Sequence, residues 1–253
     1  MKAKFKIDHY KFKTNLSKGI NISIPLISGE IGPNCFWAPP YEASPVVTEG
    51  FIGSIESGGS VNFFNIKINP HGNGTHTECV GHIEKGAFYV NQCLKESHFL
   101  TELITVIPTK IENGDKVILR SQLEQILDSQ FPIEALIIRT LPNDEDKKRR
   151  IYSNTNPPYI DHQAINFLND IGIKHLVTDL PSVDREQDEG LLLSHKAFWL
   201  PNREIVSDKT ITEMVYVPNS VKDGLYLLNI QIAPIQLDAS PSTLIIYPVK
   251  IKA

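Results

Sequence analysis

Residues 71–82 read HGNGTHTECVGH, and this segment constrains the surrounding fold more than any other part of the chain. It carries His71, His76, Glu78 and His82 among three glycines. The glycines let the backbone bend, so side chains that are not neighbours on a helix can converge on one point. Imidazole nitrogen and carboxylate oxygen together suit zinc or another first-row divalent ion. The segment therefore predicts a metal-binding loop that the rest of the fold must hold in place.

The density of candidate ligands separates this loop from an ordinary polar loop. Histidines are common on loops that bind no metal, but four candidate groups in twelve residues have no packing role. Cys79 is a candidate ligand or nucleophile, and a small buried thiol that fills space is the simpler interpretation. The alternating run 61–68 predicts a strand that leads into the loop, and a strand end is a rigid place from which to aim ligands.

The composition favours one large domain spanning residues 1–253, because this length is near the upper limit for a single core and 41% of the residues are apolar. A net charge of −4 gives no sign of a nucleic-acid or anionic-membrane partner. The basic run Lys147–Arg150 directly follows three acidic residues, which predicts a solvated loop, with a phosphate-binding patch as the alternative.

Three cysteines without a CxxC pair fit a reducing compartment. No signal peptide or long apolar span is recognisable, so we expect a cytoplasmic protein.

Hydrophobic periodicity predicts an α/β fold with mixed sheets and a few covering helices. Helical spacing at 121–129 and 160–170 alternates with short buried strands at 135–138 and 175–178, and Gly172 ends the second helix. Further strands are predicted at 103–108, 116–119, 213–217, 224–232 and 243–249. The segments 32–45 and 141–158, rich in proline, asparagine or charge, are predicted loops.

Two polar residues in apolar surroundings are candidates for further ligands. His195 lies in LLLSHKAFW, where a satisfied core histidine is the simpler interpretation. Glu213 lies in the strand-like run TITEMVY, and a buried carboxylate needs a cation or several hydrogen-bond donors.

The ordered motifs resemble the cyclase family of metal-dependent amide hydrolases, which includes bacterial kynurenine formamidase and isatin hydrolase. The family signature is His-x-Gly-Thr-His-x-Asp-x-Pro-x-His, and Gly74-Thr75-His76 and His82 match it in register. The resemblance covers about residues 60 to 250 and continues through TDLPSVD at 178–184, His195, Ile211-Thr212-Glu213 and Ala239-Ser240-Pro241-Ser242. It implies a swivelling β/β/α domain.

The resemblance also implies roles for the candidate residues. His76 and Glu78 would bind metal, and Glu78 would bridge to a second ion held by His195 and Glu213. His82 would transfer protons. The implied cofactor is one or two divalent ions, with zinc as the first choice and manganese as the alternative.

The chain departs from the signature at three positions. His71 lies one residue before the family's first ligand, where this chain has Gly72. Either a bulge lets His71 reach the ion, or the first ion has lost one ligand. Glu78 replaces the family's aspartate, and Val80 replaces its proline. These changes bear on substrate and metal identity more than on hydrolysis.

The resemblance implies an arylformamidase acting on N-formylkynurenine, in a homodimer or homotetramer. A cyclic amide such as isatin, or an ester, is the alternative substrate, and a non-catalytic metal or small-ligand binding protein is the alternative class. The aromatic loop with Phe36 and Trp37 either walls an aromatic substrate or packs on the protein. Trp199, close to His195, has the same two interpretations.

Overall fold

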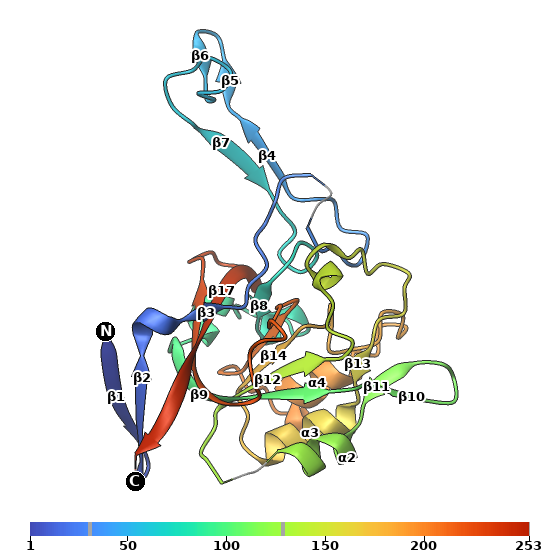
Figure 1. Cartoon of the computed structure of the whole chain (residues 1–253). Coiled ribbons are helices and arrows are strands. Elements are labelled where there is room, and N and C mark those ends of the chain that lie inside the picture. The colour runs from blue at the N-terminus through green and yellow to red at the C-terminus, as the bar shows by residue number, and fades with distance from the viewer. Residues whose placement is uncertain (30–31, 128–129, 253) are drawn as a thin grey trace.

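The computed structural model describes residues 1–29, 32–127 and 130–252, and it shows a body built on one large curved sheet from which a long arm projects (Figure 1). Within these residues the large sheet has ten strands: β1 (Lys2–Ile7), β2 (Tyr10–Asn15), β3 (Ile20–Asn21), β8 (His76–Glu78), β9 (His98–Val106), β12 (Ala135–Thr140), β14 (His175–Thr178), β15 (Thr210–Glu213), β16 (Gly224–Ile232) and β17 (Ala239–Lys252). Four α-helices accompany them in the described chain: α1 (Val90–Cys93), α2 (Arg120–Ile126), α3 (His162–Asp170) and α4 (Leu193–Trp199).

The strand order is β1-β2-β17-β16-β9-β12-β14-β15-β8, and β17 also pairs with β8. The strands β9, β12, β14 and β15 are parallel neighbours, whereas β16, β17 and β8 join antiparallel. Because β17 pairs with both β16 and β8, the sheet closes on itself. This arrangement confirms the predicted mixed sheet.

Alternate residues of the central strand β12 explain how the layers are held together. Leu136 and Ile138 pack in the cluster that contains Ile165 and Leu168 of α3, while Ile137 packs in a second cluster on the other face of the sheet. All are fully buried. A strand that is apolar on both faces is typical of a parallel sheet covered on both sides. The α/β class predicted from the sequence is confirmed.

Most of the predicted regular elements are present. The strands at 175–178 and 224–232 coincide with β14 and β16. The helix predicted at 160–170 is α3, which begins after the N-cap Asp161 and is followed by Gly172 at φ +88°. The helix predicted at 121–129 is α2, and residues 128–129 of that prediction lie outside the described residues.

The arm was not foreseen. It contains β4 (Glu42–Pro45) paired with β7 (Phe64–Lys67), and β5 (Val47–Thr48) paired with β6 (Phe51–Ile52). The strand predicted at 61–68 is therefore shorter and exposed, and the rigid element beside the ligands is β8 instead. A small sheet of β10 (Thr109–Lys110), β11 (Lys116–Ile118) and β13 (Tyr159–Ile160) completes the strands.

The solvated loop predicted for Lys147–Arg150 is wrong at Lys147. This residue lies in a 3₁₀ turn, Glu145–Arg149, and is only 5% exposed. Its Nζ donates to Asp179 Oδ2 at 2.7 Å and to the Thr140 carbonyl at 2.7 Å. The charge run therefore hides one structural lysine among solvated ones. No helix in the described part of the chain is long and apolar enough to cross a membrane.

Candidate metal centre

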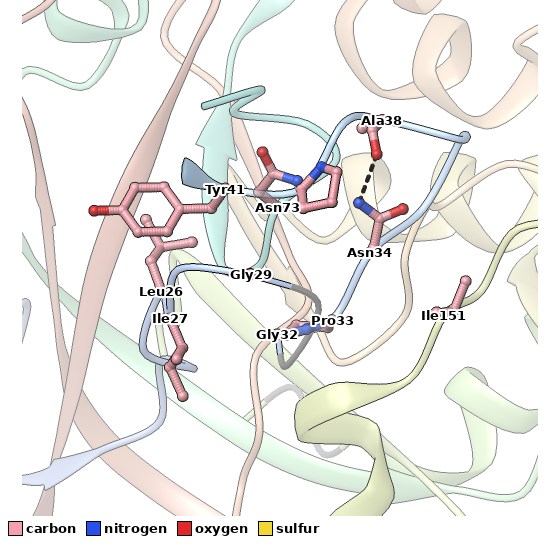
Figure 2. A pocket seen from close by; sticks show the side chains of 11 residues that line it. Leu26, Ile27, Gly29, Gly32, Pro33, Asn34, Ala38, Tyr41, Asn73 and Ile151 are labelled. Carbon is pink, nitrogen blue, oxygen red and sulfur yellow. Dashed lines mark hydrogen bonds between the residues drawn. The ribbon is translucent and has the colours of Figure 1, made fainter. Parts of the chain in front are cut away.

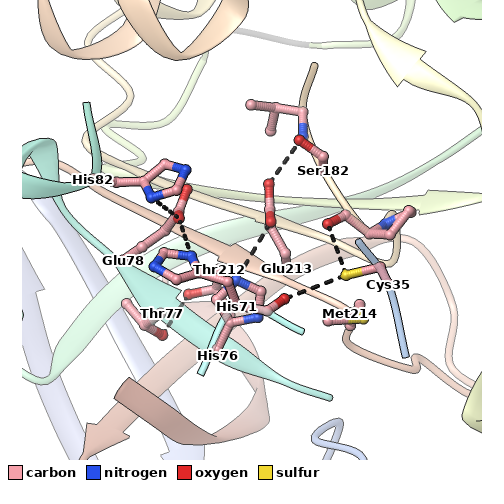
Figure 3. A network of polar contacts seen from close by, with 12 residues as sticks. Cys35, His71, His76, Thr77, Glu78, His82, Ser182, Thr212, Glu213 and Met214 are labelled. Atoms are coloured by element: carbon pink, nitrogen blue, oxygen red, sulfur yellow. Dashed lines mark hydrogen bonds and ion pairs between the residues drawn. The ribbon is translucent and has the colours of Figure 1, made fainter. Parts of the chain in front are cut away.

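The short strand β8 places His76 and Glu78 on the same face of the sheet, because side chains alternate along a strand. On the neighbouring strand β15, Glu213 lies directly opposite His76, and the two side chains approach to 3.4 Å between Nε2 and Oε2. Thr77, the residue between His76 and Glu78, lies opposite Thr212, and their hydroxyl groups form a hydrogen bond at 2.8 Å. The register of β8 and β15 therefore gathers three of the predicted ligands from distant parts of the sequence (Figure 3).

His71 reaches this cluster from the loop before β8. Its Nδ1 lies 3.0 Å from Glu78 Oε2. The His71 ring therefore contacts the cluster although His71 lies one residue before the family position. The loop is drawn tightly against residues 35–38, since a Cβ on Gly72 would lie 2.2 Å from the Ala38 Cβ. Gly74 adopts φ +97°, a conformation that favours glycine. His71 therefore lies beside Glu78, although Gly72 occupies the position that the family uses.

His195 enters from the first turn of α4. Its Nε2 lies 3.0 Å from Glu78 Oε1, opposite the oxygen that faces His71. Asp184 receives the Nδ1 hydrogen of His195 at 2.6 Å and also accepts from the backbone N–H groups of Ser194 and His195. Glu213 is anchored similarly, because the backbone N–H of Val183 donates to its Oε1 at 2.9 Å. The segment TDLPSVD at 178–184 thus anchors both His195 and Glu213, the two residues that the resemblance implies for a second ion.

Each of the three candidate ligand histidines has one ring nitrogen tied to an acceptor other than Glu78 or Glu213. For His76 the acceptor is the Gly74 carbonyl at 3.0 Å, for His195 it is Asp184, and for His71 it is Asp238 at 2.8 Å. The other nitrogens face the carboxylates. An imidazole with one N–H held by an acceptor and its second nitrogen directed at the ligand cluster is the usual arrangement of metal-bound histidine.

The Nε2 of His76 is the sharpest test of whether a metal fits. It is buried and has no hydrogen-bond partner in the described chain, although Glu213 lies nearby. An unsatisfied buried nitrogen is costly unless something else occupies its lone pair. The ligand atoms of His71, His76 and Glu78 lie within 4.8 Å of one another, as do those of Glu78, His82 and His195. The residues therefore fit one or two divalent ions, without indicating which metal.

The electrostatics of the cluster point the same way. Burial raises the pKa of Glu78, but the nearby charge of His82 and the hydrogen bond from His195 outweigh it and hold the pKa well below its usual value. Burial lowers the pKa of His71, but hydrogen bonds to Asp238 and Glu78 raise it to about 10. Glu78 thus stays charged and draws positive charge into a buried space, a role that a metal ion fills equally well.

His82 lies at the more open side of the cluster. Its side chain is 31% exposed, whereas those of His76 and His195 are 1% and 3% exposed. Its Nδ1 lies 3.4 Å from Asp238 Oδ2 and 4.0 Å from Glu78 Oε2. The structure therefore brings together all six of the predicted donor residues, with His82 as the most accessible.

Sequence reasoning missed Asp238. It lies immediately before β17, and its position next to the Ala-Ser-Pro motif was the available signal. Hydrogen bonds from His71 and His82 lower its pKa, so the carboxylate is charged at neutral pH. It belongs to the site by contact.

The predicted aromatic residues lie in different surroundings. Trp37 is 64% and Phe36 41% exposed, and both have positive φ angles. Phe36 borders a small recess together with Ser182 and Asp184, beside the cluster. Trp199 is fully buried, with its ring centroid 5.4 Å from that of His195 and its Nε1 bonded to the Lys209 carbonyl. Its position corresponds to the packing interpretation and not to a pocket wall.

A separate cavity of about 230 Å³ is lined by residues from 26–29 and 32–41, by Asn73 and by Ile151 (Figure 2). Asn34, which donates to the Ala38 carbonyl at 2.9 Å, forms part of its wall. None of the six donor residues lines this cavity. The cavity is therefore separate from the cluster.

The sequence profile of a family described as "Putative cyclase" matches residues 15–185 of the chain. The chain belongs to the cyclase family. A search of curated protein sequences gave no match.

Solved structures of similar fold carry related descriptions. A potential metal-dependent hydrolase with cyclase activity superposes with a TM-score of 0.65 at 16% identity, covering 91% of this chain and 97% of that one. A predicted metal-dependent hydrolase from Bacillus stearothermophilus gives 0.60 at 17%, covering 91% and 98%. An isatin hydrolase bound to the product analogue thioisatinate gives 0.61 at 12%, covering 92% and 93%. At these identities the likeness confirms the cyclase-like fold.

Proposed function

We propose that this cyclase-family chain is a metal-dependent hydrolase of a carbon–nitrogen bond next to a carbonyl group. We also propose that residues 1–253 form one domain. The observation that carries the proposal is the set of three imidazoles, each with one nitrogen held by an acceptor and the other turned toward Glu78 or Glu213. Cyclase-family membership and the hydrolase descriptions of similar structures support it.

The cluster would hold one or two divalent ions, with zinc as the first choice and manganese as the alternative. His71, His76 and Glu78 would form one position, and Glu78, His195 and Glu213 the other. When bound, such an ion lowers the pKa of a coordinated water toward neutrality and polarises the substrate carbonyl.

His82 is the residue we assign to proton transfer. Its Nδ1 faces Asp238, and its Nε2 has no hydrogen-bond partner in the described residues. The exposed side of the ring can therefore take a proton from water and return it to the leaving nitrogen, a task for which an imidazole is suited near pH 7.

N-formylkynurenine is the leading substrate, which makes the proposed activity that of an arylformamidase. The exposed aromatic side chains of Phe36 and Trp37, with Phe36 beside Ser182 and Asp184, offer a surface for an aromatic ring. The second candidate is a cyclic amide such as isatin, and the similarity to the isatin hydrolase fold favours it. The same activated water would serve both substrates.

The deciding experiment uses protein stripped of metal and reconstituted separately with zinc and manganese, with the metal content measured in each sample. Hydrolysis of N-formylkynurenine and of isatin is then followed for wild type and His76→Ala, with the exposed-residue variant His162→Ala as the matched control. Metal-dependent turnover that only His76→Ala abolishes supports the proposal. Bound metal without turnover of either compound indicates a binding protein, and a chain that binds no metal contradicts the site.

We further propose assembly as a homodimer or homotetramer through the arm. In the β4–β7 ladder, Ala43 faces Ile66 and Pro45 faces Phe64, so one side of the ladder is apolar, and Ile66 and Phe64 are 64% and 44% exposed. An isolated two-stranded ladder is marginal in water, and an uncovered apolar face favours association. Replacing Ile66 and Phe64 by serine should lower the molar mass measured by light scattering, and an unchanged mass would exclude this interface.

A further inference from the structure

Among the described residues, Asp238 is the one carboxylate that contacts both His71 and His82 without belonging to the residues that resemble the family motifs. A single oxygen, Oδ2, lies 2.8 Å from His71 Nε2 and 3.4 Å from His82 Nδ1. We infer that Asp238 is a positioning residue that fixes the displaced ligand His71 and the proton-transfer residue His82 together. The inference rests on the proposed function, because the roles of the two histidines come from it.

The backbone around Asp238 is fixed to the strand that carries the ligands. The Cys79 N–H donates to the Asp238 carbonyl at 3.0 Å, and the next residue, Ala239, pairs with Glu78 in the β17–β8 ladder. The preceding carbonyl, that of Leu237, accepts from the Val90 N–H at 2.8 Å. The carboxylate is therefore held at a set distance from β8 and does not follow the histidines.

His71 needs such support more than the other candidate ligands do. Its side chain is 25% exposed, while those of His76 and His195 are almost completely enclosed. It also stands in a glycine-rich loop, one residue before the position that the family uses. Because its Nε2–H is tied to Asp238, the ring presents Nδ1 toward Glu78, as a ligand in the first position requires.

The same oxygen sets the orientation of His82. The His71 and His82 rings lie side by side, with centroids 4.2 Å apart and planes inclined by 32°. Both edges therefore reach Asp238. Holding the proton of His82 on Nδ1 leaves the lone pair on Nε2, which is the nitrogen free to exchange a proton. One side chain thus couples the retention of metal to the orientation of the proton-transfer group.

The test compares Asp238→Ala, which removes both contacts, with Asp238→Asn, which keeps the shape and one acceptor oxygen. The control is Asp208→Ala, which removes a part-exposed carboxylate that pairs with Lys174. We expect Asp238→Ala to weaken zinc binding, measured by competition with a chelator, by about 10- to 100-fold. At saturating zinc its kcat should fall by at least about 10-fold while KM is little changed. Asp238→Asn should lose less of both, and Asp208→Ala should match wild type.

The same comparison in His82→Ala protein distinguishes a positioning role of Asp238 from general damage to the fold. In His82→Ala protein, adding Asp238→Ala should cost no further turnover, because its effect on turnover acts through His82, yet it should still weaken zinc binding. The visible spectrum of the cobalt-substituted protein should change with Asp238→Ala, since His71 is no longer held. If Asp238→Ala does not fold, Asp238→Asn carries both comparisons.

Wild-type zinc affinity in both Asp238 variants would overturn the inference. An additive loss of turnover in the His82→Ala background would also overturn it. Absence of turnover in the wild type would contradict the proposed function instead, and the zinc and cobalt measurements would still decide how Asp238 acts on His71.

Discussion

Replacing Lys147 by methionine should destabilise the protein strongly, because it leaves a charged group buried without its partner. Asp179 is fully enclosed and accepts from the Thr140 N–H and hydroxyl, each at 2.8 Å, as well as from Lys147 Nζ at 2.7 Å. Methionine fills much of the volume of the lysine stem but supplies no positive charge. The two bonds from Thr140 remain.

Removing one partner from a buried ion pair costs about 3–5 kcal/mol. We expect the lower half of that range, because Thr140 still satisfies Asp179 in part. For a chain of this length each kcal/mol lowers Tm by about 2–4 °C, so the expected fall is roughly 10 °C. The matched control is Lys148→Met, whose ion pair with Glu145 is exposed and should change stability by less than about 1 kcal/mol.

The way in which the free energy of unfolding depends on pH gives a second, independent test of this prediction. Burial raises the pKa of Asp179, although Lys147 and Thr140 oppose the rise. A carboxyl whose folded pKa lies above its unfolded value contributes stability at low pH, and this contribution is lost as pH rises through the folded pKa. Without Lys147 the pKa should rise further, so the loss relative to wild type should be larger at pH 7 than at pH 5.

Urea unfolding followed by tryptophan fluorescence at the two pH values measures these free energies. Adding Asp179→Asn should restore part of the stability lost in Lys147→Met, because the buried charge is then absent. Equal losses for Lys147→Met and Lys148→Met would refute the reasoning. So would a loss that grows as the pH is lowered.

Three further predictions concern the site and its frame. His82→Ala should retain metal and lose turnover by at least about 100-fold, and an unchanged kcat would remove its proposed role. Trp37→Ala should raise KM for N-formylkynurenine with little change in metal content, and the pocket interpretation fails if KM stays the same. Burial, with Lys174 nearby, lowers the pKa of His175 to about 4. The unfolded chain therefore takes up a proton first, and this residue should cost about 3 kcal/mol of stability as pH falls from 6.5 to 4. Urea unfolding across that range should show a shallower pH dependence for His175→Gln, and equal slopes would contradict the buried neutral histidine.

Local sequence patterns predicted the helices and strands whose formation depends mainly on neighbouring residues. Buried apolar runs gave β14 and β16, and an N-cap followed by helical spacing gave α3. The arm was missed because the alternation at 61–68 is real but says nothing about what the strand packs against. Alternation indicates two faces, and only tertiary contacts decide whether either face is covered.

The residues of the candidate site also divide into those that the sequence indicates and those that only the structure brings together. His71, His76, Glu78 and His82 could be proposed from the sequence because they are close together in it. His195 and Glu213 became candidates through their apolar surroundings, and motif resemblance gave them their implied roles. Asp238 was missed because its only link to the histidines is spatial.

Lys147 shows the limit of reading charge runs. Its neighbours Lys148 and Arg150 do form exposed ion pairs, as a solvated run predicts. Its own partner, Asp179, lies 32 residues away at the end of another strand. Pairing across strands is decided by the register of the sheet, which composition does not report.

The cluster can be understood as an alternating row of acids and bases with Glu78 at its centre. His71 lies between Asp238 and Glu78, and His195 lies between Glu78 and Asp184. Each outer carboxylate holds the imidazole hydrogen that faces away from Glu78, which leaves the inner nitrogens of both rings directed at the Glu78 side chain. If the cluster binds a divalent ion, the inner nitrogens are where the ion would replace a proton. Glu78 comes from β8, His195 from α4 and Asp238 from the residue before β17. The pairing of β17 with β8, which closes the sheet, therefore brings Asp238 into this row.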